Sequence, residues 1–531
     1  MKEDKRRFRE ECERAIEESR KTLKKILADN CLTEYGRKYG FSKITDPEDY
    51  RKLPITEYED YGEDIERMMQ GEEMVLTAYP VKYFLASSGS SRQKYFPITY
   101  PGITRGFDTI YCVALPNDEE WESRRHLHTS VLKIDSEDRI TILSCAELQT
   151  RRERTPEFFD KFIGGEDFIF SKEIGDQWYV KLWLALTEPG LRSIYSIYLY
   201  DILLLFQYFR EHWEEILRDM EQGIIPDKID VSRNIRQKLL SMPMPDKEWL
   251  DRVRQECRKG FSGIGKRVWK DLVMVNGIGG KVFGTQEQVL REYLGDVAVH
   301  FYIYCSSEAH IGIALEEETD CYAYIPHSCF VEFLPYDEED ENREIKWIGE
   351  LEEGEKYELV ITNFSGLYRY RLYDVVEVVG FYGQSPLLRF AFRRNMAVNI
   401  AGEKTNLSMI ADIVKEMSLR MGEKISEYSV CVDESVMPNR YCFFLEGENE
   451  GSREDYESFL EDALCRRNSD YKDLKELREI AKPVCLRVED GTHALWKEEK
   501  GVGGHNKPLQ FSADPQFIHF MKEREKHGAK K

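Results

Sequence analysis

The sequence lacks several of the signatures by which a chain reveals its class. It has no GxxxxGK[ST] phosphate loop, no GxSxG elbow and no CxxC pair, and its 12 cysteines and 10 histidines form no cluster at metal-ligand spacing. These absences argue against a P-loop hydrolase, an α/β-hydrolase and a zinc module. Cysteines that are scattered through a chain of this size indicate buried free thiols, and therefore a cytoplasmic protein.

Long apolar runs are also scarce. The most apolar window, IYSIYLYDILLLFQYF at residues 194–209, is shorter than a membrane span and contains Asp201, so we expect a buried helix there. The charged N-terminus has no apolar signal-peptide core, and its apolar residues recur at the spacing of a surface helix. The net charge of −22 argues against nucleic acids and anionic membranes as partners.

What is present indicates a large protein of mixed α/β class. The 531 residues are too many for one ordinary domain, and 41% of them are hydrophobic, which is enough for large cores. We expect mostly helix over 1–75 and 155–260, and strands around 75–86, 127–134 and 139–144 and from 297 to about 401. The strands after 350 include a hairpin with Gly354 and Gly366 at its turns.

A compact α+β unit is predicted beyond this region, in the order helix, strand, strand, helix, strand. We place the boundary at 400–406, which divides the chain into a large N-terminal domain, 1–402, and a small C-terminal domain, 403–531.

One small-residue segment, FLASSGSSRQKYFPI at residues 84–98, predicts a binding site. It follows a strand-like run and places four serines around Gly89, with Lys94 beyond them. A turn rich in hydroxyls and backbone N–H groups is suited to hold phosphate, and a lysine supplies positive charge for the same oxygens. A serine-rich surface turn is the alternative, and the segment alone does not decide between the two.

Two further segments favour the phosphate site. They are YCSSEAHIGI at 304–313 and ITNFSGLYRYRLYDVVEVVGF at 361–381, and each contains or follows a strand-like run. In this order and spacing, the three segments resemble blocks of the auxin-responsive acyl-acid amido synthetases. That family belongs to the adenylate-forming superfamily of firefly luciferase and acyl-CoA ligases. Other similar stretches, such as GVGGHNKP near the C-terminus, extend the resemblance over nearly the whole chain, as to a divergent member outside the plants.

The resemblance implies a fold and an activity. The fold is a large N-terminal adenylate-forming domain, with β-sheets and a small barrel flanked by helices, followed by a small α+β lid domain. The activity is that of an ATP-dependent, AMP-forming ligase with ATP and Mg²⁺ as cofactors. It adenylates a small carboxylic acid, releases pyrophosphate and passes the acyl group to an amine, by expectation an amino acid. Such a site must place donors and cations where negative charge develops.

The resemblance also implies residue roles. Asp374 would accept hydrogen bonds from the ribose hydroxyls, because a carboxylate offers two acceptor oxygens. Three residues are expected to be catalytic: Glu308 as the Mg²⁺ ligand, Lys404 at the hinge and Lys507 on the lid. For Glu308, Arg393 and Lys507 an ordinary surface role stays open, and for Asp374 a pairing with Arg371 or Arg369 in the hairpin stays open. The expected nucleotide-binding residues are Ser87, Ser88, Ser90, Ser91, Lys94, Tyr304, Ser306, Ser307, Asp374 and Arg393.

The chain departs from the family pattern at particular places. The phosphate segment is about two residues shorter than the family's, and Arg92 and Gln93 replace its glycine-containing stretch. Tyr373 stands where the family has glycine, and a bulky residue does not readily take positive φ, so we expect this turn to differ.

Two other functions therefore stay open. One is an adenylating ligase with a thiol or another acceptor, and the other is a non-catalytic nucleotide-binding descendant. We expect a monomer or weak dimer.

Overall fold

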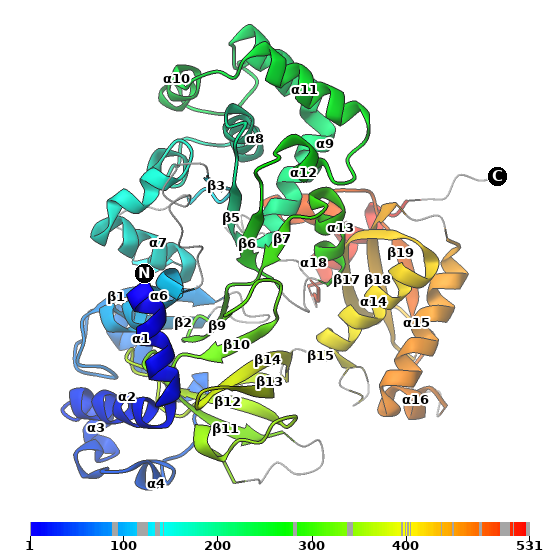
Figure 1. Cartoon of the computed structure of the whole chain (residues 1–531). Helices are drawn as coiled ribbons and strands as arrows, with labels where there is room; N and C mark the ends of the chain where they lie inside the picture. The colour runs from blue at the N-terminus through cyan, green and yellow to red at the C-terminus, as the bar shows by residue number, and fades with distance from the viewer. Residues whose placement is uncertain are drawn as a thin grey trace. The chain divides into compact units, whose positions relative to one another are not determined.

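The structure is a computed structural model in which helices and strands form two compact units (Figure 1). One unit comprises Met1–Arg125, Leu132–Lys172 and His300–Ala391, and the other comprises His126–Val131, Glu173–Val299 and Phe392–Lys531. The predicted mixed α/β fold is confirmed. The structure describes residues 2–87, 94–113, 126–132, 139–141, 143–279, 284–336, 344–394, 397–398, 400, 403, 405–436, 438–448, 451–476, 480–499, 510–512 and 514–526.

A seven-stranded sheet is the centre of the first unit, with strand order β11-β12-β13-β14-β10-β9-β8. Strands β11 and β12, and β12 and β13, pair antiparallel, so the predicted hairpin is confirmed. Gly354 and Gly366 both have positive φ at its turns, a conformation that glycine adopts without a steric penalty. The strands are β8 (Ile303–Cys305), β9 (His310–Ile313), β10 (Cys321–Tyr324), β11 (Phe330–Pro335), β12 (Lys356–Thr362), β13 (Tyr370–Tyr382) and β14 (Ser385–Arg393).

A three-stranded sheet of the same unit frames the predicted phosphate segment. β1 (Val81–Ser87) pairs antiparallel with β2 (Lys94–Thr99) and parallel with β4 (Ile140–Thr141). The strand that we expected over 75–86 begins only at Val81, because Pro80 lacks the N–H that a ladder requires. Helices α6 (Tyr100–Val113) and α7 (Leu143–Arg154) follow β2 and β4.

The predicted N-terminal helix is present as two helices, α1 (Lys2–Glu13) and α2 (Ala15–Asn30). Their apolar positions, including Phe8, Cys12 and Leu23, are buried in the first unit. The apolar residues of this stretch recur at helical spacing, so one face packs and the other carries the charges.

The second unit contains a four-stranded sheet, ordered β3-β5-β6-β7, in which β3 with β5 and β5 with β6 are parallel. The expectation of a helix over 194–209 is wrong in its first part, because β5 (Ser193–Tyr198) precedes α9 (Leu199–Gln222). A parallel strand that is buried on both faces reads as a continuous apolar run, which periodicity does not distinguish from a buried helix. The other strands are β3 (His126–His128), β6 (Met274–Ile278) and β7 (Ala298–His300).

The C-terminal part of this unit follows the predicted order. α14 (Leu407–Met421) leads to β17 (Lys424–Asp433) and β18 (Arg440–Glu448), and α15 (Arg453–Arg467) and α16 (Ser469–Glu476) lead to β19 (Val484–Arg487). One face of the β17-β18-β19 sheet packs on α14 and α15 (Figure 1). The other face packs on α17 (Thr492–Glu499) and α18 (Pro515–Glu523).

Buried charges dock α17 on this sheet. Glu427 of β17 and Glu446 of β18 face each other across the ladder, and both are buried. Lys497 of α17 reaches Glu427 at 3.3 Å, and one turn earlier the His493 N–H donates to Glu446 at 2.6 Å. The His493 ring contacts Glu446 through Nδ1 and Ser429 Oγ through Nε2, at 2.5 and 2.9 Å. The Tyr200 hydroxyl of α9 also donates to Glu427.

Among the described residues, no helix is both long enough and apolar enough to cross a membrane.

Candidate active site

The structure describes only part of the predicted site. Ser88, Ser90, Ser91, Lys404 and Lys507 lie outside the described residues, and of Ser87 only the backbone is described. Arg393 ends β14 and is half-buried. The roles of all these residues stay predictions.

The two flanks of the phosphate segment meet at the open end of the β1–β2 hairpin. Ser87 and Lys94 are paired residues of that ladder, so the backbone brings the first serine next to the lysine. The Lys94 Nζ lies 5.0 Å from the ring centroid of Tyr58. The backbone N–H of Tyr95 donates to the Tyr58 hydroxyl at 2.9 Å. Tyr58 therefore supports β2 where the phosphate segment ends.

The second segment forms a closed turn after β8. The backbone N–H of Ser306 donates to the carbonyl of Ala309 at 2.9 Å, and Ser306 Oγ accepts from the N–H groups of Glu308 and Ala309 at 3.3 Å. Ser307 is half-buried in this turn. Glu308 is buried, and its carbonyl accepts from the Asn363 side chain at 2.8 Å. Asn363 belongs to the third segment, so the second and third segments are joined at this point.

A second bond joins the same two segments at Asp374. The Tyr304 hydroxyl donates to Asp374 Oδ2 at 3.0 Å, and both residues are buried. The arginines of this hairpin have other carboxylate partners. Arg369 donates to Glu332 at 2.9 Å, and Arg371 forms a two-pronged pair with Glu358. The structure therefore bonds Tyr304 to Asp374 and the carbonyl of Glu308 to Asn363, so the second and third segments are joined at two points.

Asp374 lies in a β-bulge, directly after a residue with positive φ. The register of β12 and β13 shifts between Glu358 and Val360, and Tyr373 has a φ of 65°. Tyr373 therefore takes a left-handed conformation that we did not expect of a bulky residue, and a difference from the family's turn stays a prediction.

Two contacts hold the side chain of Tyr373 in place. The Arg371 guanidinium lies 4.8 Å from the ring centroid, and the hydroxyl donates to Glu57. Burial, together with Glu57, raises the pKa of Tyr373, so the hydroxyl stays protonated and donates.

Sequence reasoning missed four residues of this region: Glu57, Tyr58, Asn363 and His310. Glu57 and Tyr58 lie in LPITEYEDYGED, a stretch without a recognisable binding motif. Asn363 directly precedes the Ser-Gly turn, which was its one available signal. His310 of β9 is buried, and its Nε2 contacts Glu147 of α7, a pairing of distant residues that no local pattern encodes.

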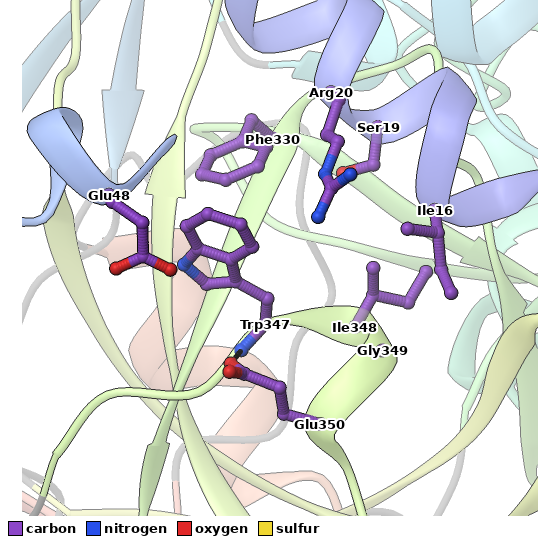
Figure 2. Close-up of a pocket in the computed structure, with 9 residues that line it drawn as sticks. All are labelled: Ile16, Ser19, Arg20, Glu48, Phe330, Trp347, Ile348, Gly349 and Glu350. Carbon is purple, nitrogen blue, oxygen red and sulfur yellow. Dashed lines mark hydrogen bonds between the residues drawn. The ribbon is translucent and has the colours of Figure 1, made fainter. Parts of the chain in front are cut away.

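A shallow pocket of about 250 Å³ lies elsewhere in the first unit. Figure 2 shows the Trp347 and Phe330 rings and the Arg20 side chain around it. Arg51 also lies over Trp347, at 4.2 Å from the ring centroid. None of the predicted site residues lines this pocket, so it is separate from the cluster at Asp374. Its lining residues are Ile16, Ser19, Arg20, Glu48, Phe330, Trp347, Ile348, Gly349 and Glu350.

Three family models match the chain in succession. The model of the GH3 family N-terminal domain matches residues 4–299, that of the central domain matches 322–393 and that of the C-terminal domain matches 408–514. Indole-3-acetic acid-amido synthetase GH3.3 of Arabidopsis thaliana is 25% identical over 95% of this chain and 86% of its own length. Jasmonoyl–L-amino acid synthetase GH3.5 of Oryza sativa subsp. japonica is 28% identical over 82% and 80%.

Solved structures share the fold. GH3.15 acyl acid amido synthetase superposes with a TM-score of 0.84 at 21% identity, covering 97% of this chain and 94% of that one. A 2-hydroxyisobutyryl-CoA ligase in the postadenylation state, with 2-hydroxyisobutyryl-AMP bound, superposes with a TM-score of 0.55 at 12% identity, covering 94% and 90%. The fold is therefore that of the adenylate-forming enzymes.

Proposed function

Because this chain belongs to the GH3 family, we propose that it is an ATP-dependent acyl-acid amido synthetase. It adenylates a carboxylic acid, releases pyrophosphate and transfers the acyl group to an amine, and is therefore an AMP-forming ligase. One observation carries the proposal beyond family membership. The Tyr304–Asp374 bond joins two of the three predicted nucleotide segments, which are 70 residues apart in the chain.

The donors and acceptors of this cluster fit a nucleotide and a divalent cation. Asp374 is a buried carboxylate at the end of a fixed bulge, suited to the ribose hydroxyls. Glu308 is a buried carboxylate in a closed turn, suited to bind Mg²⁺ together with phosphate oxygens. Lys94 and the serines from Ser87 to Ser91 supply positive charge and hydroxyls for the leaving phosphates. A bound Mg²⁺ would supply charge stabilisation for phosphoryl chemistry.

The substrates are proposed as classes. The relatives named above act on indole-3-acetic acid and form jasmonoyl–amino acid products, and a GH3.15 structure holds 2,4-DB. Two of these names contain a carboxylic acid or its acyl group, and GH3.15 is itself named an acyl acid amido synthetase. We infer the same class here, with an amino acid as the amine acceptor.

The domain roles belong to the same proposal. Residues 1–402 form the adenylation domain and 403–531 form the lid, with Lys404 at the hinge and Lys507 facing the nucleotide when the lid is closed. Arg393 would steady the nucleotide. The enzyme is proposed to work in the cytoplasm as a monomer or weak dimer.

The direct test is ATP–pyrophosphate exchange over a panel of carboxylic acids, followed by amide formation with amino acids and Mg²⁺. Acid-dependent exchange without transfer to any amine, but with transfer to a thiol, would support the alternative acceptor. A lack of exchange with every acid would favour a non-catalytic nucleotide-binding protein.

Two variants test the site. Asp374→Ala should weaken AMP binding by about ten- to a hundred-fold, because a hydrogen bond to a charged group contributes about 1.5–3 kcal/mol. Glu308→Gln should remove most exchange activity while it preserves the fold, because it keeps the shape and deletes the charge. Glu316→Gln, at an exposed loop residue, is the matched control. Wild-type exchange in Glu308→Gln at all Mg²⁺ concentrations would refute the metal role.

Lys507→Ala tests the lid. It should slow adenylation by at least about tenfold, the scale of one charge-assisted contact, and should spare amide formation from supplied acyl-adenylate. Equal losses in both half-reactions would contradict this division of roles.

A further inference from the structure

The segment from Thr56 to Tyr61 is attached to the beginning of β13. The Thr56 N–H donates to the Arg369 carbonyl, and the Arg371 N–H donates to the Thr56 carbonyl, each at 2.9 Å. The side-chain hydroxyls of Thr56 and Tyr61 both donate to the Tyr368 carbonyl at 2.8 Å. Thr56 and Tyr61 are buried, so the segment is fixed at both ends.

Between these anchors, two neighbouring side chains reach different strands. The backbone of Glu57 is extended, with φ −121° and ψ 176°, and in extended backbone successive side chains point to opposite sides. Glu57 accepts the hydroxyl of Tyr373 on β13, next to Asp374. Tyr58 accepts the N–H of Tyr95 on β2, next to Lys94.

Each contact supports a strained or charged element of the candidate site. Tyr373 holds positive φ without being glycine, a conformation that is stable only where other contacts outweigh its strain. The Tyr58 ring lies under Lys94 and packs against Phe96, with ring centroids 5.4 Å apart. The ring therefore holds β2 as well as the lysine that it carries.

We propose that Glu57 and Tyr58 are positioning residues that fix the ribose carboxylate and the phosphate lysine relative to each other. This inference rests on the proposed function, because it takes Asp374 and Lys94 as nucleotide contacts. Glu57 acts on Asp374 through Tyr373, and Tyr58 acts on Lys94 through β2. Neither residue needs to touch the nucleotide.

The proposal predicts that the two residues affect different parts of the ligand. AMP contains the ribose but no leaving phosphates, whereas ATP contains both. Loss of the Glu57 contact should weaken AMP and ATP alike. Loss of the Tyr58 contact should weaken ATP and pyrophosphate and leave AMP unchanged. A merely structural role would weaken all three ligands together.

The experiment measures equilibrium binding of AMP, ATP and pyrophosphate to Glu57→Ala, Tyr373→Phe, their double variant and Tyr58→Phe, in the full chain with Mg²⁺. Each hydrogen bond contributes about 1 kcal/mol, so we expect losses of about three- to tenfold. The Glu57→Ala and Tyr373→Phe losses should not add, because both remove the same bond. Glu59→Ala, at the exposed neighbour, is the matched control.

The outcomes separate this inference from the proposed function. If the wild-type chain binds neither AMP nor ATP, the proposed function fails. If the wild type binds both but all variants lose every ligand equally, or lose none, the positioning roles fail. If Tyr373→Phe does not fold, the comparison of ligand binding between Glu57→Ala and Tyr58→Phe still tests the positioning roles. Both variants change side chains that are at least partly exposed.

Discussion

The β12–β13 and β17–β18 hairpins bury carboxylates in different ways. In the first, Glu358 of β12 is paired with Arg371 of β13, and Glu332 of the neighbouring β11 is paired with Arg369, which directly precedes β13. In the second, Glu427 and Glu446 are paired with residues of α17, a helix later in the chain. The first arrangement stiffens one sheet around Asp374, whereas the second fastens a helix to a sheet.

The difference extends to the protonation of the carboxylates. Burial raises the pKa of Glu332, and the attraction of Arg369 does not fully offset it. Burial also acts on Glu446, but the His493 side chain and the N–H groups of His493 and Gly491 outweigh it and lower its pKa. The hydrogen bonds from His493 and Gly491 thus favour the charged form of Glu446 more than the ion pair with Arg369 favours that of Glu332.

We expect the largest loss of stability when the ion pair between Arg369 and Glu332 is broken. Arg369→Met leaves Glu332 buried without its cation and should cost about 3–5 kcal/mol, the usual penalty for an unpaired buried charge. Urea unfolding, combined with hydrogen exchange of β12 and β13, measures it. Arg389→Met is the control, because Arg389 and its partner Asp320 are partly exposed and their pair should contribute less than about 1 kcal/mol. Similar losses in both variants would contradict the comparison.

Breaking the ion pair between Lys497 of α17 and Glu427 of β17 should lower the free energy of unfolding by a smaller amount. Lys497→Met leaves Glu427 with the Tyr200 hydroxyl as a remaining donor, so we expect about 2–3 kcal/mol. The loss should appear as faster hydrogen exchange in α17 and β17, with β12 and β13 unchanged. Lys475→Met, at a more exposed pair with Glu461, serves for comparison. Unchanged exchange in α17 would show that Lys497 does not dock the helix.

Lowering the pH should affect the stability of the two hairpins differently, without any mutation. The lowered pKa of Glu446 gives stability that is present above its ordinary value of 4.5 and is lost as pH falls through the folded value. The raised pKa of Glu332 has the opposite sign, because its stabilising protonation is gained as pH falls and lost as pH rises through the folded value. Hydrogen exchange, corrected for its intrinsic pH dependence, should show β18 losing protection before β12. Simultaneous loss would count against these pKa directions.

The smallest effect concerns one hydroxyl. Ser429→Ala removes the partner of His493 Nε2 and should cost about 1 kcal/mol. The unfolding midpoint in urea measures it, with Ser435→Ala as an exposed comparison on the same hairpin. A cost as large as that of Lys497→Met would mean that the histidine, rather than the lysine, dominates the docking of α17.

Local patterns predicted much of this fold. The glycines at 354 and 366 marked the β12–β13 hairpin, and alternating and helical periodicity gave the order of elements beyond 407. β5 was missed because its apolar run lacks the alternation of a half-buried strand. At the site, the resemblance identified Tyr304 and Asp374, and their bond stands in the structure. The contacts that hold Tyr373 and β2 in place were not predictable from local patterns. The Tyr373–Glu57 bond joins residues 316 positions apart, and the Tyr95–Tyr58 bond joins residues 37 positions apart.

The face-to-face placement of Glu427 and Glu446 also bears on how the chain folds as it is synthesised. Two carboxylates opposite each other repel, so the pairing of β17 with β18 is weakened at this position until their counter-charges have been synthesised. Those charges lie later in the chain, with His493 47 residues after Glu446 and Lys497 70 residues after Glu427. We therefore expect the nascent β17–β18 hairpin to become stable only after α17 has been synthesised, so that the hairpin and the helix form together in one cooperative step.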